Sequence, residues 1–149
     1  PTAQQALDEY GDEVAWVYRH FPLDQLHQQA RPEALASECV YEQTGDEGFW
    51  KFTDHVYKIT PTNDGLDLTQ LPTYAQEAGV TDIAKFQACL DSKQYDSRIE
   101  EDLASGAKAG VTGTPGSVLL DTKSGKSQLI SGAVPYPQLK SAIDQMLAN

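Results

Sequence analysis

The two cysteines are the residues of this sequence that could carry redox or metal chemistry. Cys39 and Cys89 lie far apart in the chain, and neither belongs to a C-x-x-C pair. Two isolated cysteines with no paired histidines nearby cannot build a standard zinc site, so we expect neither a metal nor another cofactor. The cysteines are either buried free thiols or one disulfide. A stable disulfide would indicate an oxidising compartment.

A second candidate site is the stretch Gly113-Thr114-Pro115-Gly116. A proline between glycines, just before an apolar run, predicts a sharp and rigid corner, and an X-Pro bond can be cis at modest cost. Such a corner would leave the backbone of Thr114 free to pair with an extended peptide. The alternative is an ordinary loop that leads into a strand, and these residues alone leave both interpretations open.

Other residues with chemical potential are interpreted as structural. Three histidines form no Ser-His-Asp arrangement and no metal-ligand spacing, and we expect them to be packed or solvated: His20, His27 and His55. Four aromatic side chains are predicted to belong to the core: Trp16, Phe49, Trp50 and Phe52. The acidic run Glu100-Glu101-Asp102 is predicted to be a solvated helix face.

Composition limits the classes of partner. The chain has 149 residues, of which 40% are hydrophobic, enough for one compact domain with a core and room for an inserted subdomain. Asp and Glu number 22 against 11 Lys and Arg, a net charge of -11. This balance disfavours nucleic acid and anionic membrane surfaces, which bind basic proteins. No run is long and apolar enough to span a bilayer.

The elements that must position these residues follow from hydrophobic periodicity and from Gly and Pro breaks. A helix is predicted over 2–10, and a strand buried on both faces over 13–21. Most of 24–109 is predicted to form a block of about five helices, with breaks at Gly45, at the polar turn 61–65 and at Gly79, and with the last helix over 92–109. A hairpin (117–121 with 126–131), indicated by the turn from Asp121 to Gly125, and a helix over 136–147, which begins at Pro135 and Pro137, close the chain. The order predicts a small α/β domain that contains a helical insertion.

The chain resembles the DsbA-like thiol-disulfide oxidoreductases of the thioredoxin superfamily, over essentially its whole length. The stretches that carry the resemblance are DEYGD at 8–12, WVYRHFPL at 16–23, Gln43 with Phe49-Trp50 and Asp54, FQACLDS at 86–92, and GVTGTP at 110–115. Each stretch is weak evidence by itself, and their order along the chain makes the resemblance specific.

The resemblance implies an α/β, thioredoxin-like fold with an inserted all-helical subdomain. Residues 1–23 and 107–149 would form a partial thioredoxin-like domain, and 24–106 the insertion. The strands of the hairpin and the strand at 13–21 would share one sheet with helices on both faces. The family's first strand and its reactive C-x-x-C would lie upstream of Pro1, so we expect this chain to be the C-terminal major part of a longer protein.

The resemblance also assigns roles. Pro115 is expected to be cis, Gly113, Thr114 and Pro115 to bind substrate, and Cys39 and Cys89 to form a structural disulfide. No catalytic residue is expected within the chain, which by itself should not catalyse thiol-disulfide exchange, because exchange needs an accessible thiolate. The implied partners are cysteine-containing proteins or peptides and a membrane redox partner, in the periplasm or at the cell surface, with no nucleic acid.

Two other functions remain open. A non-catalytic thioredoxin-fold module could bind peptides by the same edge. A glutathione-using isomerase or transferase on this scaffold would carry a serine at the reactive position. The sequence immediately before Pro1 would discriminate among them, since C-x-x-C favours the oxidoreductase.

Overall fold

The computed structural model describes residues 2–61 and 63–148, which form two compact units. Unit 1 comprises residues 1–21 and 104–149, and unit 2 comprises residues 22–103. The domain limits inferred from the sequence, 23/24 and 106/107, stay a prediction, because compactness alone does not show which part folds independently.

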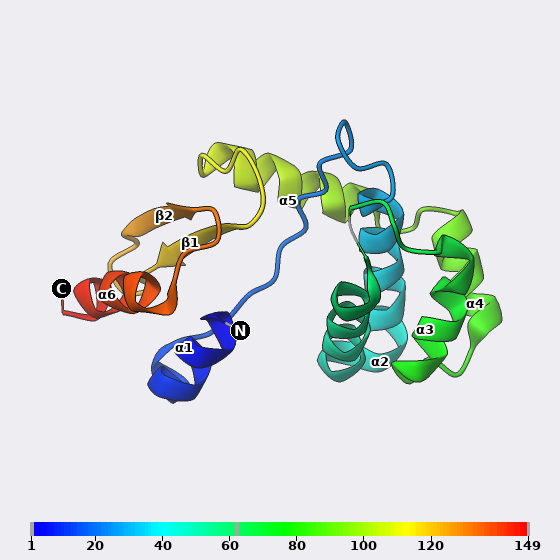
Figure 1. Ribbon diagram of the computed structural model, residues 1–149, viewed down its shortest axis with the longest axis horizontal. Helices are drawn as coiled ribbons and strands as arrows, with labels where there is room; N and C mark the ends of the chain where they lie inside the picture. Colours follow the sequence, from blue (N-terminus) through cyan, green and yellow to red (C-terminus); the bar gives the residue numbers. More distant parts are fainter. Residues whose placement is uncertain (1, 62, 149) are drawn as a thin grey trace. The chain divides into compact units, whose positions relative to one another are not determined.

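Unit 1 is built from two helices and a hairpin (Figure 1). Its elements are α1 (Thr2–Tyr10), the 3-10 turn η1 (Gly11–Glu13), β1 (Gly116–Leu120), β2 (Ser127–Ser131), α6 (Tyr136–Leu147) and the last residues of α5 (Asp96–Lys108). The strands are antiparallel, with Gly116 opposite Ser131. The carboxylate of Asp121 accepts hydrogen bonds from the backbone N–H groups of Lys123 and Ser124, which closes the connection between the strands.

A small apolar core holds unit 1 together. Its buried members come from α1, β2 and α6: Ala6, Ile130, Leu139, Ala142 and Ile143. Leu119 of β1 packs against this core, whereas Val118 and Leu120 point to the opposite face of the hairpin and are exposed. The helices predicted over 2–10 and 136–147 and the predicted hairpin are confirmed.

The predicted strand over 13–21 is wrong. Residues 14–23 have no regular secondary structure, and the sheet within the described residues consists of β1 and β2 paired with each other. The predicted burial on both faces fails as well, because Trp16 is 40% exposed and Val17 is 74% exposed. An alternating apolar sequence becomes a strand only when a neighbouring strand accepts from its N–H groups and donates to its C=O groups, and no described strand pairs with this segment.

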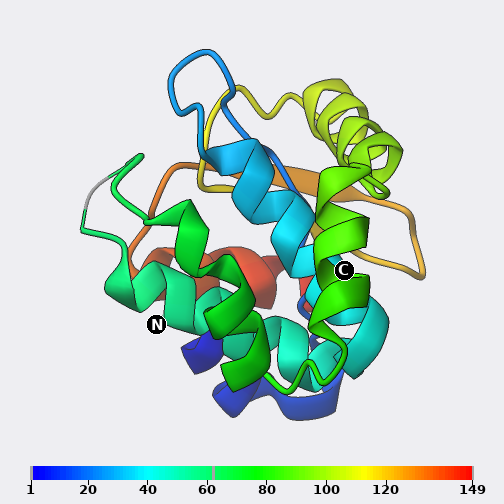
Figure 2. The ribbon, with the colours of Figure 1, turned by 90° about the vertical axis from the view of Figure 1, so that its right-hand side faces the viewer.

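Unit 2 is helical. It contains α2 (Ala30–Ile59), η2 (Leu68–Gln70), α3 (Leu71–Glu77), α4 (Ile83–Asp91) and most of α5. In Figure 2 this unit faces the viewer, and α2, α3 and α4 pack side by side. The predicted break at Gly45 is confirmed, since φ 65° and ψ −158° there interrupt the helix. Within the described ranges, no helix is long and apolar enough to cross a membrane.

Two details of unit 2 differ from expectation. The helix predicted from residue 92 begins at Asp96, because Lys93 takes a φ of 51° in the turn that ends α4. Trp50, predicted to be core, is 36% exposed, whereas Phe49 and Phe52 are buried.

The acidic run on α5 is only partly solvated. Asp102 lies on the same face of the helix as the buried Ile99 and is only 7% exposed. Glu100 forms an ion pair with Arg31 at 2.6 Å.

Candidate functional site: the loop between α5 and β1

The loop that joins α5 to β1 is fixed at its first residues by the end of the helix. Gly110 takes a φ of 88°, a left-handed conformation that glycine adopts without strain and that stops the helix. The N–H of Val111 then donates to the carbonyl of Gly106 at 2.9 Å. This arrangement turns the chain sharply back toward the hairpin.

The loop is fixed again where it enters β1. The Thr114–Pro115 peptide bond is cis, and the carbonyl of Pro115 accepts a hydrogen bond of 2.8 Å from the N–H of Gly132, just beyond β2. A Cβ on Gly116 would lie 2.8 Å from a methyl carbon of Val111, so the two ends of the loop touch through a glycine that leaves room for valine. The corner predicted from the sequence is therefore tied down on both sides.

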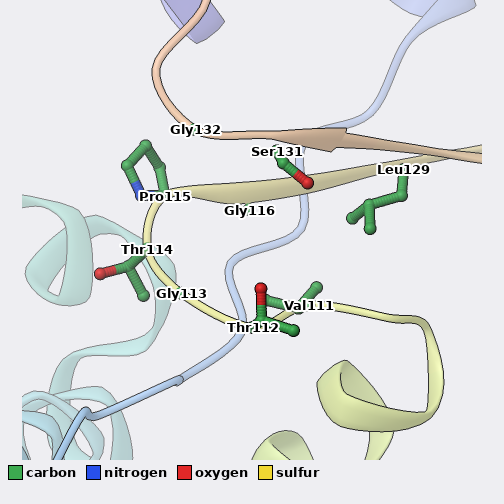
Figure 3. Close-up of a pocket in the computed structure, with 9 residues that line it drawn as sticks. All are labelled: Val111, Thr112, Gly113, Thr114, Pro115, Gly116, Leu129, Ser131 and Gly132. Carbon is green, nitrogen blue, oxygen red and sulfur yellow. The ribbon is translucent and has the colours of Figure 1, made fainter.

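A cavity of about 200 Å³ lies against this loop. Its lining comes from the loop and from the end of β2: Val111, Thr112, Gly113, Thr114, Pro115, Gly116, Leu129, Ser131 and Gly132. In Figure 3, Ser131 and Leu129 lie on one side of the open space and Val111 and Thr112 on the other. The Thr114 side chain points away from Ser131 and Leu129.

The backbone of the loop is available for pairing. Thr114 is exposed, and neither its N–H nor its C=O forms a hydrogen bond with any part of the chain that the structure describes. The same holds for the N–H and C=O of Gly113. Peptide groups in this state prefer to gain partners, and an extended segment laid beside residues 113–115 would supply them.

The cavity lining offers groups for binding but holds no titratable acid or base that could activate its hydroxyls. Its polar side chains are the hydroxyls of Thr112, Thr114 and Ser131, and no histidine, cysteine or charged residue contributes. His20 lies buried in edge contact with Tyr18, and His55 lies 3.5 Å from Glu77. In the described residues no group of three His, Cys, Asp or Glu side chains is placed to hold a metal ion.

Cys39 and Cys89 form a disulfide, with their Cα atoms 6.0 Å apart. Of the two possibilities that the spacing left open, the structure contains this one. Cys39 is 0% exposed and Cys89 is 3% exposed, within the core of unit 2. Because thiol-disulfide exchange needs direct access of a thiolate to sulfur, this bond is placed for structural support.

The contribution of β2 to the cavity was missed from the sequence. Leu129, Ser131 and Gly132 reach the loop because the hairpin register sets Ser131 opposite Gly116. The predicted strands, 117–121 and 126–131, already place residue 131 close to residue 116. Their lengths could therefore have indicated that β2 lines the cavity.

The hairpin, the loop in front of it, the closing helix and the helical unit together define a protein of the thioredoxin-like fold class. The chain belongs to the thioredoxin family: the family described as "Thioredoxin" matches residues 2–145. A solved structure, DsbA2 of Pseudomonas aeruginosa, is similar over 98% of this chain and 78% of its own, with a TM-score of 0.79 and 29% identity. The predicted DsbA-like fold is thereby confirmed.

Curated relatives match over a small part of their own length. The Na(+)/H(+) antiporter NhaA of Herminiimonas arsenicoxydans is 35% identical over 106 residues, which are 71% of this chain and 16% of the antiporter. Na(+)/H(+) antiporter NhaA 1 of Mycolicibacterium gilvum is 30% identical over 116 residues, 74% of this chain and 18% of that protein. The chain thus spans less than a fifth of the length of these relatives.

Proposed function

We propose that these residues form the substrate-binding part of a DsbA-like thiol-disulfide oxidoreductase that acts on cysteine-containing proteins or peptides. The observation that carries the proposal is the unpaired backbone of Gly113 and Thr114, exposed on a loop that is fixed at both ends. A rigid loop adds binding free energy because little conformational entropy is lost when a peptide pairs with it. The family membership and the similarity to DsbA2 support the same assignment.

The roles of the loop residues follow from this geometry. The N–H and C=O of Thr114 pair with the extended substrate segment, and Pro115, which has no N–H, presents its ring beside that segment. An uncharged substrate side chain next to the cysteine enters the cavity between Thr112 and Ser131. Gly113 keeps the approach to the backbone open, since nothing lies within 4 Å of the position a Cβ would take.

The chemistry requires a C-x-x-C that these 149 residues do not contain, and the proposal places it in the natural protein upstream of residue 1. A substrate thiolate attacks the oxidised C-x-x-C, forms a mixed disulfide and releases one C-x-x-C sulfur as thiolate. The second substrate thiolate then attacks the mixed disulfide, which forms the substrate disulfide and leaves the C-x-x-C reduced. A membrane redox partner that accepts two electrons would reoxidise the pair.

The buried Cys39–Cys89 disulfide supports a location outside the cytoplasm, in the periplasm or at the cell surface, because stable disulfides persist in oxidising compartments. Residues 24–106 would serve as the inserted helical subdomain of this oxidoreductase, and 1–23 with 107–149 as its thioredoxin-like domain. The antiporter names belong to proteins of which this chain spans less than a fifth, and we propose no ion transport for these residues.

A second candidate is a non-catalytic module that binds peptides with the same loop. It is favoured by the cavity lining, which holds no titratable side chain, and by the enclosure of both cysteines in a disulfide. Thiol-disulfide exchange by the full-length protein separates the two functions.

The experiment that tests this proposal has two measurements. Backbone amide NMR of the chain is recorded during titration with an extended peptide whose cysteine is S-methylated, and the full-length protein is assayed for oxidation of a dithiol peptide. The oxidoreductase predicts shifts at Gly113, Thr114 and Ser131 together with turnover. Shifts without turnover would favour the binding module, and amides that do not respond would contradict both functions.

A further inference from the structure

Helix α1 makes limited apolar contact with the rest of unit 1, through Ala6 and the partly buried Tyr10. Of its residues, Ala6 alone is buried, at 3% exposure, and its methyl group packs into the core formed with α6 and β2. A helix as short as Thr2–Tyr10 is marginal in water without tertiary support. The position of α1 therefore depends on what else holds it.

A cluster of charged and phenolic side chains joins the last turn of α1 to α6. The Nζ of Lys140 lies 2.7 Å from Oε1 of Glu9 and donates to the hydroxyl of Tyr10 at 3.2 Å. The same ammonium lies 5.0 Å from the centre of the Tyr10 ring, a cation–π contact. Lys140 of α6 thus contacts the last two residues of α1, Glu9 and Tyr10.

Two further groups complete the cluster. The hydroxyl of Tyr10 donates to Oδ1 of Asp144 at 2.5 Å, and the ammonium of Lys140 lies 3.3 Å from Oδ2 of the same carboxylate. The hydroxyl of Tyr136 donates to Oε2 of Glu9. Tyr136, Lys140 and Asp144 belong to α6, and Glu9 and Tyr10 belong to α1. Each contact of the cluster between the two helices therefore involves Glu9 or Tyr10.

The cluster is stronger than a single surface ion pair. An isolated exposed pair contributes little, because solvent screens it and both side chains lose rotamer freedom. Here Lys140 is shared among two carboxylates and a phenol, so the entropy lost in fixing it is lost once for several contacts. Both oxygens of Glu9 and both oxygens of Asp144 have partners.

We propose that Lys140 is a positioning residue, which clamps the C-terminal end of α1 to α6 through Glu9, Tyr10 and Asp144. This inference rests on the proposed function. The clamp fixes the direction of α1 within unit 1. The resemblance places the C-x-x-C shortly before Pro1, next to the N-terminal end of this helix, and the clamp would therefore hold the reactive thiol in register with residues 113–115. Removal of the clamp would slow disulfide transfer without changing the substrate loop itself.

The test uses hydrogen exchange of backbone amides in the full-length protein, read separately over 2–10 and over β1 and β2. Lys140→Met and Glu9→Gln should each speed exchange over 2–10 by about tenfold, with no change in the hairpin. Lys140→Arg, which keeps a cation in reach of Glu9, should restore protection. Lys126→Met is the matched control, since it removes the same charge from an exposed position in the hairpin connection. The double variant Glu9→Gln/Lys140→Met should show less than the sum of the single effects.

Protection over 2–10 that is unchanged in both single variants would overturn the clamp. An equal loss of protection in α1 and in the hairpin would overturn it too, since that result means general destabilisation. In the same protein, disulfide transfer should fall about tenfold in Lys140→Met and recover in Lys140→Arg. Transfer equal to that of the wild type would overturn the positioning role. A wild type without transfer would overturn the proposed function, and hydrogen exchange alone would then decide for or against the clamp.

Discussion

The ring of Phe21 lies directly against the backbone of Gly106 in α5. A Cβ on residue 106 would be 2.8 Å from both Cδ2 and Cε2 of the ring, closer than carbon atoms approach without displacement. This contact attaches the extended segment that precedes unit 2 to the C-terminal end of α5, and both belong to unit 1. Arg19 supports the same attachment through a hydrogen bond of 3.0 Å to the hydroxyl of Ser105.

Replacing Gly106 by alanine should therefore destabilise the protein, although alanine is the better helix former. At an open helical position the change would stabilise by up to about 1 kcal/mol. Against the Phe21 ring it should instead cost about 1–3 kcal/mol, because the ring or the helix must move. Urea unfolding of Gly106→Ala measures the sign of the change in the free energy of unfolding. A gain in stability would contradict the contact between Phe21 and Gly106.

Removal of the Cys39–Cys89 disulfide should destabilise unit 2. Closure of a loop of this length contributes about 4 kcal/mol in the chain-entropy model. The double variant Cys39→Ala/Cys89→Ala is expected to unfold at lower urea concentration by a comparable amount. Because both sulfurs are enclosed, a mild reductant should leave the native protein oxidised while it reduces the urea-unfolded protein. Rapid thiol release from the native protein would contradict the enclosure.

Arg31 should be more important to unit 2 than a surface arginine. It forms ion pairs with Asp24 at 2.6 Å, Asp96 at 2.8 Å and Glu100 at 2.6 Å, and these carboxylates hold its pKa above the ordinary value. Arg31→Met leaves three mutually repelling acids, and after allowance for their exposure we expect a loss of about 1–2 kcal/mol.

The matched control for Arg31 is Lys51→Met. It breaks an exposed pair with Glu47 of 3.1 Å within α2 and should change the free energy of unfolding by less than about 0.5 kcal/mol. Equal effects of the two variants in chemical denaturation would show that the Arg31 cluster adds nothing beyond surface charge.

The clamp between α1 and α6 should weaken at both extremes of pH. Hydrogen bonds from Lys140 and Tyr136 lower the pKa of Glu9 below its ordinary 4.5, and a hydrogen bond from Tyr10 lowers that of Asp144 below 3.8. Lowered carboxylate pKa values stabilise the folded state above pH 4.5 and 3.8, and this stabilisation is lost as pH falls through the folded values.

At alkaline pH the clamp loses stability as the pH rises. The hydrogen bond to Glu9 raises the pKa of Tyr136 from 10.0 to about 12, so its contribution is complete below pH 10 and is lost as pH rises toward 12. Ultraviolet titration of the tyrosinates should show one phenol near pH 12 that disappears in Tyr136→Phe. If Tyr136→Phe leaves the titration curve unchanged above pH 10, the hydrogen bond to Glu9 is not formed in solution.

Local signals in the sequence predicted local structure well. Pro135 and Pro137 marked the start of α6, Gly45 marked the break in α2, and Asp121 with Gly125 marked the hairpin, because each acts through its own backbone geometry. The corner at Pro115 was predicted on the same basis. The place of Pro115 in the cavity lining follows from that corner.

Features that depend on distant neighbours were not predictable in the same way. The alternation over 13–21 indicated a strand, yet pairing requires another strand in the right place, and the segment is not part of the described sheet and leaves Val17 exposed. Asp102 was read as solvated from its charge, although its spacing from Ile99 puts it on the buried face of α5. The place of Ser131 in the cavity follows from hairpin register, which no single motif encodes.

The pairing of a substrate backbone with Thr114 is the central claim, and an ester substitution in the substrate tests it most directly. Two cysteine peptides are compared as substrates of the full-length protein, one with an ester in place of the amide that donates to the Thr114 carbonyl, and one with the ester two residues further along. Loss of one hydrogen bond of about 0.5–1.5 kcal/mol predicts a rate of disulfide transfer about 2–10-fold lower for the first peptide alone. Equal rates for both ester peptides and the parent amide would contradict the claim.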